Sequence, residues 1–253
     1  MIKPAGRKYP SVAEMNDDEH IGVVREIFAS ITLQYDFLNH LLSLRRDIAW
    51  RRFTARRMRF SRTYRFLDVA TGTADLAIDA AQRHPRIRVT GVDFVPEMME
   101  MGRRKIEKKG LSRRIRLIMS DAVHLPFPDN SFDVSGIAFG IRNIPRRIRV
   151  LREMTRVVVP NGQVMVLEMT PPRNRIFRGI YRTFLRKILP HLARSFSPNP
   201  AAYDYLGDSI MHFPSAGDFV RFMGEAGLEK VDAFSLTLGI THLYVGVKPA
   251  SAG

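Results

Sequence analysis

The chain contains no cysteine among its 253 residues. Disulfide bonds, thiolate metal sites and cysteine nucleophiles are therefore excluded, and we expect no metal centre. The sequence has no run of 18 or more apolar residues, so we expect no helix that spans a bilayer. The first ten residues contain no apolar segment of signal-peptide length, which predicts a cytoplasmic protein.

Acidic residues are scarce relative to basic ones. The chain has 25 Asp and Glu against 40 Lys and Arg, a net charge of +15 at pH 7. This balance favours a polyanionic partner, either nucleic acid or an anionic membrane surface, although a merely soluble basic protein is the alternative. The hydrophobic content of 45% is that of a globular protein, and the length suits one large α/β domain with appended helices.

Short apolar segments alternate with helical patterns through the middle of the chain. We expect strands at residues 65–70, 87–93, 114–119, 132–138 and 162–169, with helices between them. Nearly continuous apolar strands that alternate with helices predict a mostly parallel sheet covered on both faces. Two final strands, at 229–236 and 240–248, should pair antiparallel because only a short turn separates them. The prediction is a seven-stranded Rossmann-like α/β fold, which resembles the architecture of the class I methyltransferases.

The remaining segments suggest additions to this core. Residues 1–18 are polar and contain proline, so we expect a flexible N-terminus. Residues 19–62 show a helical pattern and predict an N-terminal helical cap. The core at 63–170 is followed by 171–210, which breaks the alternation and predicts a helical lid insertion. Residues 211–250 should complete the sheet.

The turn after the first predicted strand suits a nucleotide. It reads Asp-Val-Ala-Thr-Gly-Thr-Ala-Asp at residues 68–75, with Asp68 at the strand end and Gly72 before a helix. In open α/β sheets, ligands bind beyond the carboxyl ends of the strands, and glycine lets the backbone approach them closely. Thr73 offers a hydroxyl and an amide at the helix N-terminus, where a methionine carboxylate would be stabilised.

Acidic residues also follow the next two predicted strands. Asp93 comes 21 residues after the glycine of the turn, a spacing that suits a ribose diol. Asp121, followed by Ala122, is placed to accept from an adenine amino group. Three strand-end acids in register favour S-adenosylmethionine as the cofactor. An NAD-dependent dehydrogenase is the runner-up, but the chain lacks G-x-G-x-x-G, and Ala70 and Ala74 stand where methyltransferases usually have glycine.

Three longer sequence segments match motifs of known protein families. Two are narrow: Tyr-Asp-Phe-Leu-Asn-His-Leu-Leu-Ser at 35–43, with Trp50 after it, and Phe-Gly-Ile-Arg-Asn-Ile at 139–144. The third, at 125–133, recurs in many methyltransferases. Through these strings the chain resembles the ubiquinone/menaquinone biosynthesis C-methyltransferases, from about residue 23 to 249. It departs from that family's preferences at Asp47, Asn161, Thr170 and Tyr244.

The resemblance implies methylation of a ring carbon in a reduced, prenylated quinone precursor, either demethylmenaquinol or a polyprenyl-methoxy-benzoquinol. Arg142 would then supply positive charge to a quinol oxygen, and Asn143 would orient the ring or a water molecule. The alternative is that Arg142 pairs with an acid such as Asp36 and only holds the N-terminal helices in place.

Four further residues are candidates for the acceptor pocket. Tyr35 and Asn39 are four residues apart and should share one helix face. Tyr203 and Tyr205 are similar candidates. The alternative for the tyrosines is a place in the core with a bonded hydroxyl.

The insertion concentrates positive charge beside apolar residues. Between 173 and 194 the basic residues, with no acidic one among them, are Arg173, Arg175, Arg178, Arg182, Arg186, Lys187 and Arg194. The apolar positions that recur in pairs every four residues are Ile176, Phe177, Ile180, Tyr181, Phe184, Leu185, Ile188, Leu189 and Leu192. An apolar stripe flanked by basic residues is typical of a helix that lies in an anionic membrane interface. It predicts peripheral attachment to the inner face of the membrane, where a prenylated quinol resides. Packing of the stripe on the domain is the alternative.

A methyltransferase acting on RNA or on another small molecule is the competing class, because basic runs also occur at 45–65 and 103–116. Cysteine-dependent cytosine methylation is excluded, and residues 139–143 replace the Asp/Asn-Pro-Pro-aromatic motif of amino-methylating enzymes. With no recognisable RNA-binding module, we expect no nucleic-acid partner. A non-catalytic binding role is a third class, disfavoured by the strand-end acids. The sequence leaves open the choice between benzoquinol and naphthoquinol, and between monomer and homodimer.

Overall fold

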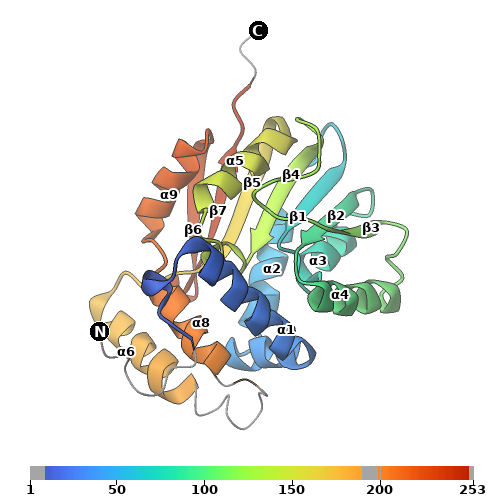
Figure 1. Ribbon diagram of the computed structural model, residues 1–253. Helices are drawn as coiled ribbons and strands as arrows, with labels where there is room; N and C mark the ends of the chain where they lie inside the picture. Colours follow the sequence, from blue (N-terminus) through green and yellow to red (C-terminus); the bar gives the residue numbers. More distant parts are fainter. Residues whose placement is uncertain (1–8, 190–198, 200, 251–253) are drawn as a thin grey trace.

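The computed structural model describes residues 9–189, 199 and 201–250, without the side chains at 38, 41 and 42. Seven strands form one sheet in the order β3-β2-β1-β4-β5-β7-β6 (Figure 1). Their bounds are β1 Arg65–Val69, β2 Arg88–Asp93, β3 Ile115–Met119, β4 Phe132–Ala138, β5 Val158–Met169, β6 Glu229–Leu236 and β7 Thr241–Val247. β1 to β5 pair in parallel, whereas β7 runs antiparallel to both β5 and β6. The predicted sheet, including the antiparallel hairpin, is confirmed.

The strand order reverses at β1. The chain adds β2 and β3 on one side of β1 and then returns to place β4 on its other side. Asp68 in β1 is in register with Gly91 of β2 and Gly136 of β4. A reversal of this kind leaves a crevice beyond the carboxyl ends of the two central strands, which is where ligands bind in open α/β sheets.

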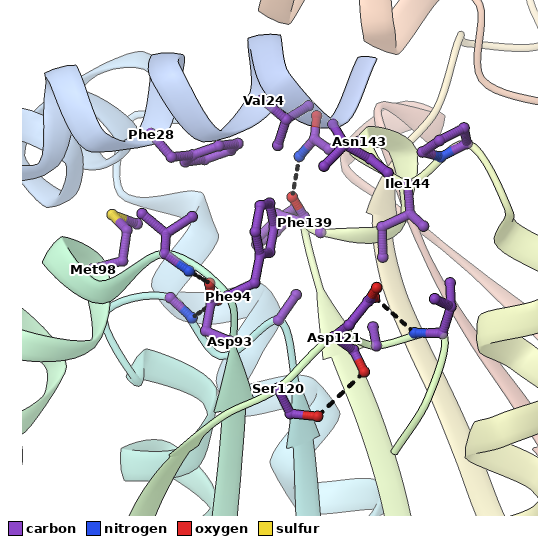
Figure 2. A pocket seen from close by; sticks show the side chains of 18 of the residues that line it. Val24, Phe28, Asp93, Phe94, Met98, Ser120, Asp121, Phe139, Asn143 and Ile144 are labelled. Atoms are coloured by element: carbon purple, nitrogen blue, oxygen red, sulfur yellow. Dashed lines mark hydrogen bonds between the residues drawn. The ribbon is translucent and has the colours of Figure 1, made fainter. Parts of the chain in front are cut away.

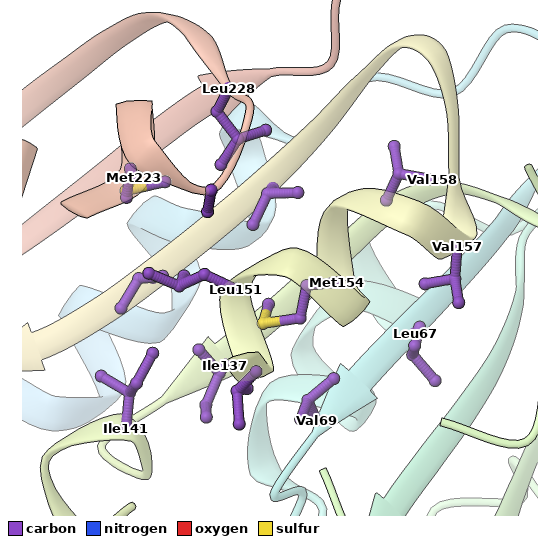
Figure 3. Packing of buried hydrophobic residues seen from close by; sticks show 14 of the residues in the cluster. Leu67, Val69, Ile137, Ile141, Leu151, Met154, Val157, Val158, Met223 and Leu228 are labelled. Carbon is purple, nitrogen blue, oxygen red and sulfur yellow. The ribbon is translucent and has the colours of Figure 1, made fainter. Parts of the chain in front are cut away.

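Helices cover both faces of the sheet. α5 (Arg147–Val157) and α9 (Ala216–Glu225) pack on one face, and α2 (Arg46–Arg57), α3 (Asp75–Arg83) and α4 (Pro96–Lys108) on the other. In Figure 3, Leu151 and Met154 of α5 lie against Ile137 of the sheet. Each such buried side chain contributes roughly 1.5–3 kcal/mol to folding. The two apolar clusters fix the rigid sheet on which the loops at its carboxyl edge are mounted.

A helical layer lies across the carboxyl ends of the central strands (Figure 1). It consists of α1 (Asp17–Leu42), α6 (Arg175–Thr183) with the π-helical turn η3 (Phe184–Ile188), and α8 (Ala201–Met211). A third apolar cluster joins Ile27 of α1 to Leu185 and Ile210. Helix α1 of the predicted cap and helices α6 and α8 therefore form one layer, whereas α2 packs on the sheet. None of the helices in the described ranges combines the length and apolar content needed to cross a membrane.

The N-terminal segment corrects one expectation. Residues 1–8 lie outside the described residues, but residues 9–18 are packed rather than flexible. The Tyr9 side chain is buried, and its hydroxyl donates to Glu26 at 3.0 Å. Ser11, just before the 3₁₀ turn η1 (Val12–Glu14), donates to Asp208 of α8 at 2.8 Å. The polar composition that predicted disorder instead supplies hydrogen bonds to the helical layer.

Candidate functional site

Two cavities open at the carboxyl ends of β1 and β4. The smaller has a volume of about 340 Å³ and the larger about 500 Å³. Both are lined by Tyr35, Ala70, Gly72, Ala138 and Phe139, so they adjoin at the turn after β1. Volumes of this size suit small organic ligands, and two adjoining cavities suit a pair of reacting molecules.

The backbone where the cavities meet is conformationally unusual. Gly72 has φ +53°, but Ala70, Ala74 and Phe139 also adopt left-handed φ values of 49°, 65° and 58°. A Cβ atom at Gly140 would lie 2.9 Å from that of Ala70, so this loop admits no side chain there. The two alanines thus keep the geometry for which other chains use glycine, at a cost of about 1–2 kcal/mol each.

The smaller cavity has Asp93 at its floor (Figure 2). Its two carboxylate oxygens accept hydrogen bonds from the backbone amides of Gly72 and Val95, at 2.8 and 2.9 Å. Burial raises the pKa of Asp93, although these amides partly offset the effect. Each carboxylate oxygen has a second lone pair, so Asp93 can still accept from a pair of hydroxyls. Its geometry suits the ribose diol predicted for it.

The other end of the smaller cavity is a slot between β3 and α1. Asp121 and Ala122 line it, and Asp121 Oδ1 accepts from the Val123 amide at 3.0 Å. Val24 and Phe28 of α1 lie on the opposite side (Figure 2). A flat aromatic base with an exocyclic amino group fits such a slot, since apolar side chains cover its face and a carboxylate accepts at its edge.

Asp68 lies at the junction of strand and turn. It is 1% exposed and lines the larger cavity. Its Oδ2 accepts from the Thr71 hydroxyl at 2.7 Å and from the Ala77 amide at 3.1 Å. Burial raises the pKa of Asp68 to about 7, against the lowering effect of these two bonds. The carboxylate therefore both fixes the turn and is available to a cationic group in the cavity.

The Thr73 hydroxyl has a partner within the protein, and its predicted contact with the cofactor stays a prediction. Thr73 lines the larger cavity, but its hydroxyl donates to Asp36 of α1 at 2.7 Å. Lys105 of α4 donates to Asp36 at 2.7 Å and also contacts Asp75. The hydroxyl expected to meet a methionine carboxylate is thus engaged in a network that ties α1 to α3 and α4.

Arg142 belongs to the 3₁₀ turn η2 (Ile141–Asn143) and lines the larger cavity. Its Nη1 lies 2.8 Å from Oε1 of Glu168, a fully buried residue near the end of β5. Burial alone would lower the pKa of Arg142, but Glu168, together with Tyr35 and Tyr205, outweighs it, so the pKa is raised and the guanidinium remains charged. The pairing with an acid that the alternative predicts is present, but the acid is Glu168 rather than Asp36.

Asn143 faces the smaller cavity, whereas its neighbour Arg142 faces the larger one. The Asn143 amide group donates weakly to the Phe139 carbonyl, at 3.5 Å, and its Oδ1 accepts from the Tyr205 hydroxyl at 3.2 Å. The Tyr205 hydroxyl also lies 2.8 Å from Nε2 of the buried His20. The contacts therefore fix Asn143 at the wall of the smaller cavity, and the ring-orienting role predicted for it stays a prediction.

The four predicted acceptor-pocket residues divide into two pairs. Tyr35 and Asn39 both line the larger cavity, on one face of α1. Tyr203 and Tyr205 are 3% and 5% exposed, pack in the helical layer and line neither cavity. Their burial follows the core alternative, and the Tyr205 hydroxyl is bonded to His20 and Asn143.

The larger cavity is otherwise mostly apolar. The Trp50 and Phe139 rings, 6.1 Å apart, form part of its wall. Further apolar lining comes from Met169, Phe177, Phe184, Leu185, Leu189, Leu206, Ile210 and Ile240. Leu44 and Ile180 also line it while being 82% and 62% exposed, so they mark where it opens to the outside. The arrangement suits an aromatic ring that bears a long apolar chain.

The apolar stripe of the insertion is split between two environments. Tyr181, Leu185 and Leu189 are buried, whereas Ile176, Ile180 and Ile188 are 78%, 62% and 49% exposed. Of the eight described positions of the stripe, three are buried, three are exposed and two, Phe177 and Phe184, are partly buried. The predicted alternative, packing on the domain, therefore applies to one edge of the stripe, and membrane contact by the exposed edge stays a prediction. Leu192 and Arg194 lie outside the described residues.

Sequence reasoning missed two residues of the site. One is Glu168, although an acid at the end of a buried strand is the same signal that identifies Asp93. Tyr181 was read as an apolar position on a helical stripe, and nothing in its spacing shows that it lines the larger cavity.

Comparison with known proteins agrees with the geometry. The model of the ubiE/COQ5 methyltransferase family matches residues 13–248. A ubiquinone/menaquinone biosynthesis C-methyltransferase UbiE of Geobacter sp. (strain M21) is 42% identical over 89% of this chain and 96% of its own length. A demethylmenaquinone methyltransferase of Deinococcus radiodurans is 39% identical over 94% of this chain and 97% of its own.

A solved structure shares the fold. A SAM-dependent methyltransferase from Thermotoga maritima superposes with a TM-score of 0.61 at 18% identity, covering 88% of this chain and 98% of that one.

Proposed function

The chain belongs to the ubiE/COQ5 methyltransferase family, and we propose that it transfers the methyl group of S-adenosylmethionine to a ring carbon of a reduced, prenylated quinone precursor. The observation that supports this most is the pair of adjoining cavities at the end of β1. One suits a nucleoside, and the other combines a buried cation, Arg142, with an apolar channel. The relatives whose names specify ubiquinone/menaquinone or demethylmenaquinone match this chain over almost their whole length.

The residues of the smaller cavity fit S-adenosylmethionine. Asp93 would accept from the ribose hydroxyls and Asp121 from the adenine amino group, while Ala122 and Phe28 cover the base. Asp68, which lines the larger cavity two residues before the shared residue Ala70, would pair with the ammonium of the methionine portion. The cofactor supplies an electrophilic methyl group. A bond forms between this methyl group and the ring carbon while the methyl–sulfur bond breaks. The sulfonium becomes a thioether, and the ring releases a proton.

The larger cavity would hold the acceptor. A quinol carbon is nucleophilic when the neighbouring hydroxyl becomes phenolate-like, so the site must stabilise negative charge on that oxygen. Arg142 remains charged in the cavity and is held in place by Glu168. Trp50 and Phe139 would orient the ring, and their contact places it beside the junction with the smaller cavity. Methylation of RNA is not favoured, because the walls of this cavity are mostly apolar.

We also propose that α6 rests on an anionic lipid bilayer. Ile176 and Ile180 project from it with large exposed fractions, and Leu44 is exposed at the opening of the larger cavity. The exposed basic residues on the same helix and the turn after it are Arg175, Arg178, Arg182 and Arg186. Apolar side chains edged by arginine complement anionic headgroups and acyl chains. A prenylated substrate could then enter the cavity without crossing water.

The proposed reaction is tested by incubating the protein with labelled S-adenosylmethionine and with demethylnaphthoquinol and demethylbenzoquinol acceptors in parallel. Label in either quinol supports the proposal and shows which ring is used. Label in added RNA, with none in either quinol, overturns it.

A further inference from the structure

The larger cavity holds buried polar groups that the protein itself does not satisfy. In the described part of the chain, six buried side-chain atoms have no hydrogen-bond partner. Three of them belong to residues lining this cavity, namely Arg51, Arg142 and Tyr181. A buried group without a partner costs about 1–3 kcal/mol, so several in one cavity point to a ligand that satisfies them.

Arg51 differs from the other two. Its unpartnered Nε lies 3.8 Å from Asp79, and its Nη2 pairs with Asp47 at 2.9 Å and Asp75 at 3.1 Å. Its charge is thus already surrounded by carboxylates. Arg142 has a single carboxylate partner, Glu168, which bonds Nη1 and leaves Nε unpartnered, and the Tyr181 hydroxyl has no partner at all. These are the two remaining donors without a partner in the cavity.

Tyr181 and Arg142 line the same cavity. Tyr181 is 7% exposed and lines the larger cavity from α6, opposite the sheet edge that supplies Arg142. The charge of Arg142 reaches the Tyr181 hydroxyl, yet burial outweighs it and raises the pKa of Tyr181. The hydroxyl therefore keeps its proton and can donate it in a hydrogen bond.

We infer that the Tyr181 hydroxyl is a ligand of the acceptor: together with Nε of Arg142, it donates to the ring oxygen on which negative charge develops during methyl transfer. The inference rests on the proposed function and extends it to a residue of the lid. A hydrogen-bond donor that has no partner in the free protein is available to the acceptor oxygen, and it can stabilise the charge that this oxygen gains in the transition state. It also gives α6 two faces, with Ile180 outside at the opening and Tyr181 inside.

The Tyr181→Phe variant separates this role from a structural one. Since the hydroxyl has no partner in the protein, its removal should leave Tm unchanged or raise it. Turnover with the quinol acceptor should fall roughly 100-fold, as for the loss of one oxyanion donor, while KM for S-adenosylmethionine stays the same. Tyr244→Phe is the matched control, because its hydroxyl is also buried and unpartnered but lies outside both cavities. It should change neither turnover nor KM.

A binding probe keeps the test independent of methyl transfer. 4-Nitrophenol changes absorbance on ionisation, so the pKa of the bound phenol can be read directly. Wild type should lower the pKa of the bound probe, Tyr181→Phe should raise it again by about one unit, and Tyr244→Phe should not. If the pKa of the bound probe depends on Tyr181 but no methyl group is transferred to quinols, the proposed substrate is refuted. The inference that Tyr181 helps to bind an oxyanion would then still stand. A lower Tm with unchanged turnover and probe pKa would overturn the inference.

Discussion

Nη1 of Arg142 lies 2.8 Å from Oε1 of Glu168, and neither side chain is more than 6% exposed. Arg142, in the turn after β4, lines the larger cavity, and Glu168 of β5 lies behind it, so the pair fixes a cation at the cavity wall. A buried charge is held there only while its partner remains. The pair thus links the stability of the fold to the chemistry of the site.

Replacing Arg142 should therefore have two effects that can be separated. Arg142→Ala should abolish most turnover and leave the affinity for S-adenosylmethionine nearly unchanged. It should also lower the free energy of unfolding by about 3–5 kcal/mol, because Glu168 is left buried and unpaired. Adding Glu168→Gln should restore stability measured by urea denaturation, but not turnover. Full activity in either variant would contradict the role of the guanidinium.

Asp93 should govern cofactor affinity. Asp93→Asn keeps one acceptor oxygen for the turn but loses the charge that strengthens the bonds to the ribose hydroxyls. A charged hydrogen bond is worth about 1.5–3 kcal/mol, so Kd for S-adenosylmethionine in calorimetry should rise about 10- to 150-fold. Asp129→Asn, at a carboxylate whose side chain is 66% exposed, is the control and should leave Kd unchanged.

Asp68 should make cofactor binding depend on pH near neutrality. Its pKa is about 7, so below that pH the carboxyl is largely protonated and cannot attract an ammonium group. Kd for S-adenosylmethionine should fall as pH rises from 6 to 8, and Asp68→Asn should weaken binding and flatten the profile. Asp79→Asn is the matched control: burial raises its pKa to about 6, but it lines neither cavity. An unchanged profile in Asp68→Asn would refute the assignment.

The same carboxyl should affect the stability of the free protein in the opposite sense. The pKa of Asp68 is raised from 3.8 to about 7 on folding. Between these values the folded state holds a proton that the unfolded state has lost, so the contribution of Asp68 to the free energy of unfolding decreases as pH rises and is constant above about pH 7. Comparing urea denaturation of wild type and Asp68→Asn across this interval measures that contribution. A difference between the two that does not vary with pH would contradict it.

The left-handed alanine at the start of α3 should tolerate glycine. Ala74 has φ +65°, where a Cβ costs about 1–2 kcal/mol, while glycine loses about 0.5–1 kcal/mol more in chain entropy. Ala74→Gly should therefore be neutral or stabilising by up to about 1 kcal/mol in urea denaturation. Ala80→Gly, within the same helix, should destabilise by about 1 kcal/mol or more. Equal losses in both variants would argue against strain at Ala74.

Membrane contact through α6 can be tested with liposomes. Co-sedimentation should require anionic lipid, and an Ile176→Ser/Ile180→Ser variant should weaken it because two exposed apolar anchors are lost. Met119→Ser removes a side chain that is 64% exposed at the edge strand β3, and should have no effect. Lipid-independent pelleting, or equal loss in both variants, would contradict the proposal.

The sheet and its strand-end acids could be predicted because each depends on local sequence. The alternation of apolar strands and helices predicts the parallel order, and Asp93 and Asp121 follow their strands at the spacing that a nucleotide requires. The helical layer could not be predicted in the same way, since its residues are placed by contacts between segments far apart in the chain. Tyr205 bonds to Asn143, 62 residues away, and Thr73 to Asp36, 37 residues away.

For α6, the periodicity of the sequence predicted the apolar stripe but not which of its edges is buried. It identified an apolar stripe but not that Ile180 faces outwards and Tyr181 inwards. Consecutive residues on a helix differ by about 100° in direction, so a wide stripe can contact two environments, and only the packing of α1 and α8 decides which edge is buried. The same contacts place Tyr203 in the core rather than in the cavity.

The central claim is that methyl transfer forms a carbon–carbon bond on a quinol ring. The most direct measurement uses S-adenosylmethionine with a ¹³C-labelled methyl group and a demethylated, prenylated quinol, followed by carbon NMR of the extracted product. We predict one labelled resonance in the region of methyl groups bonded to an aromatic carbon, absent with Arg142→Ala. A labelled resonance in the region of methyl ethers, or no label in the quinol, would contradict the account.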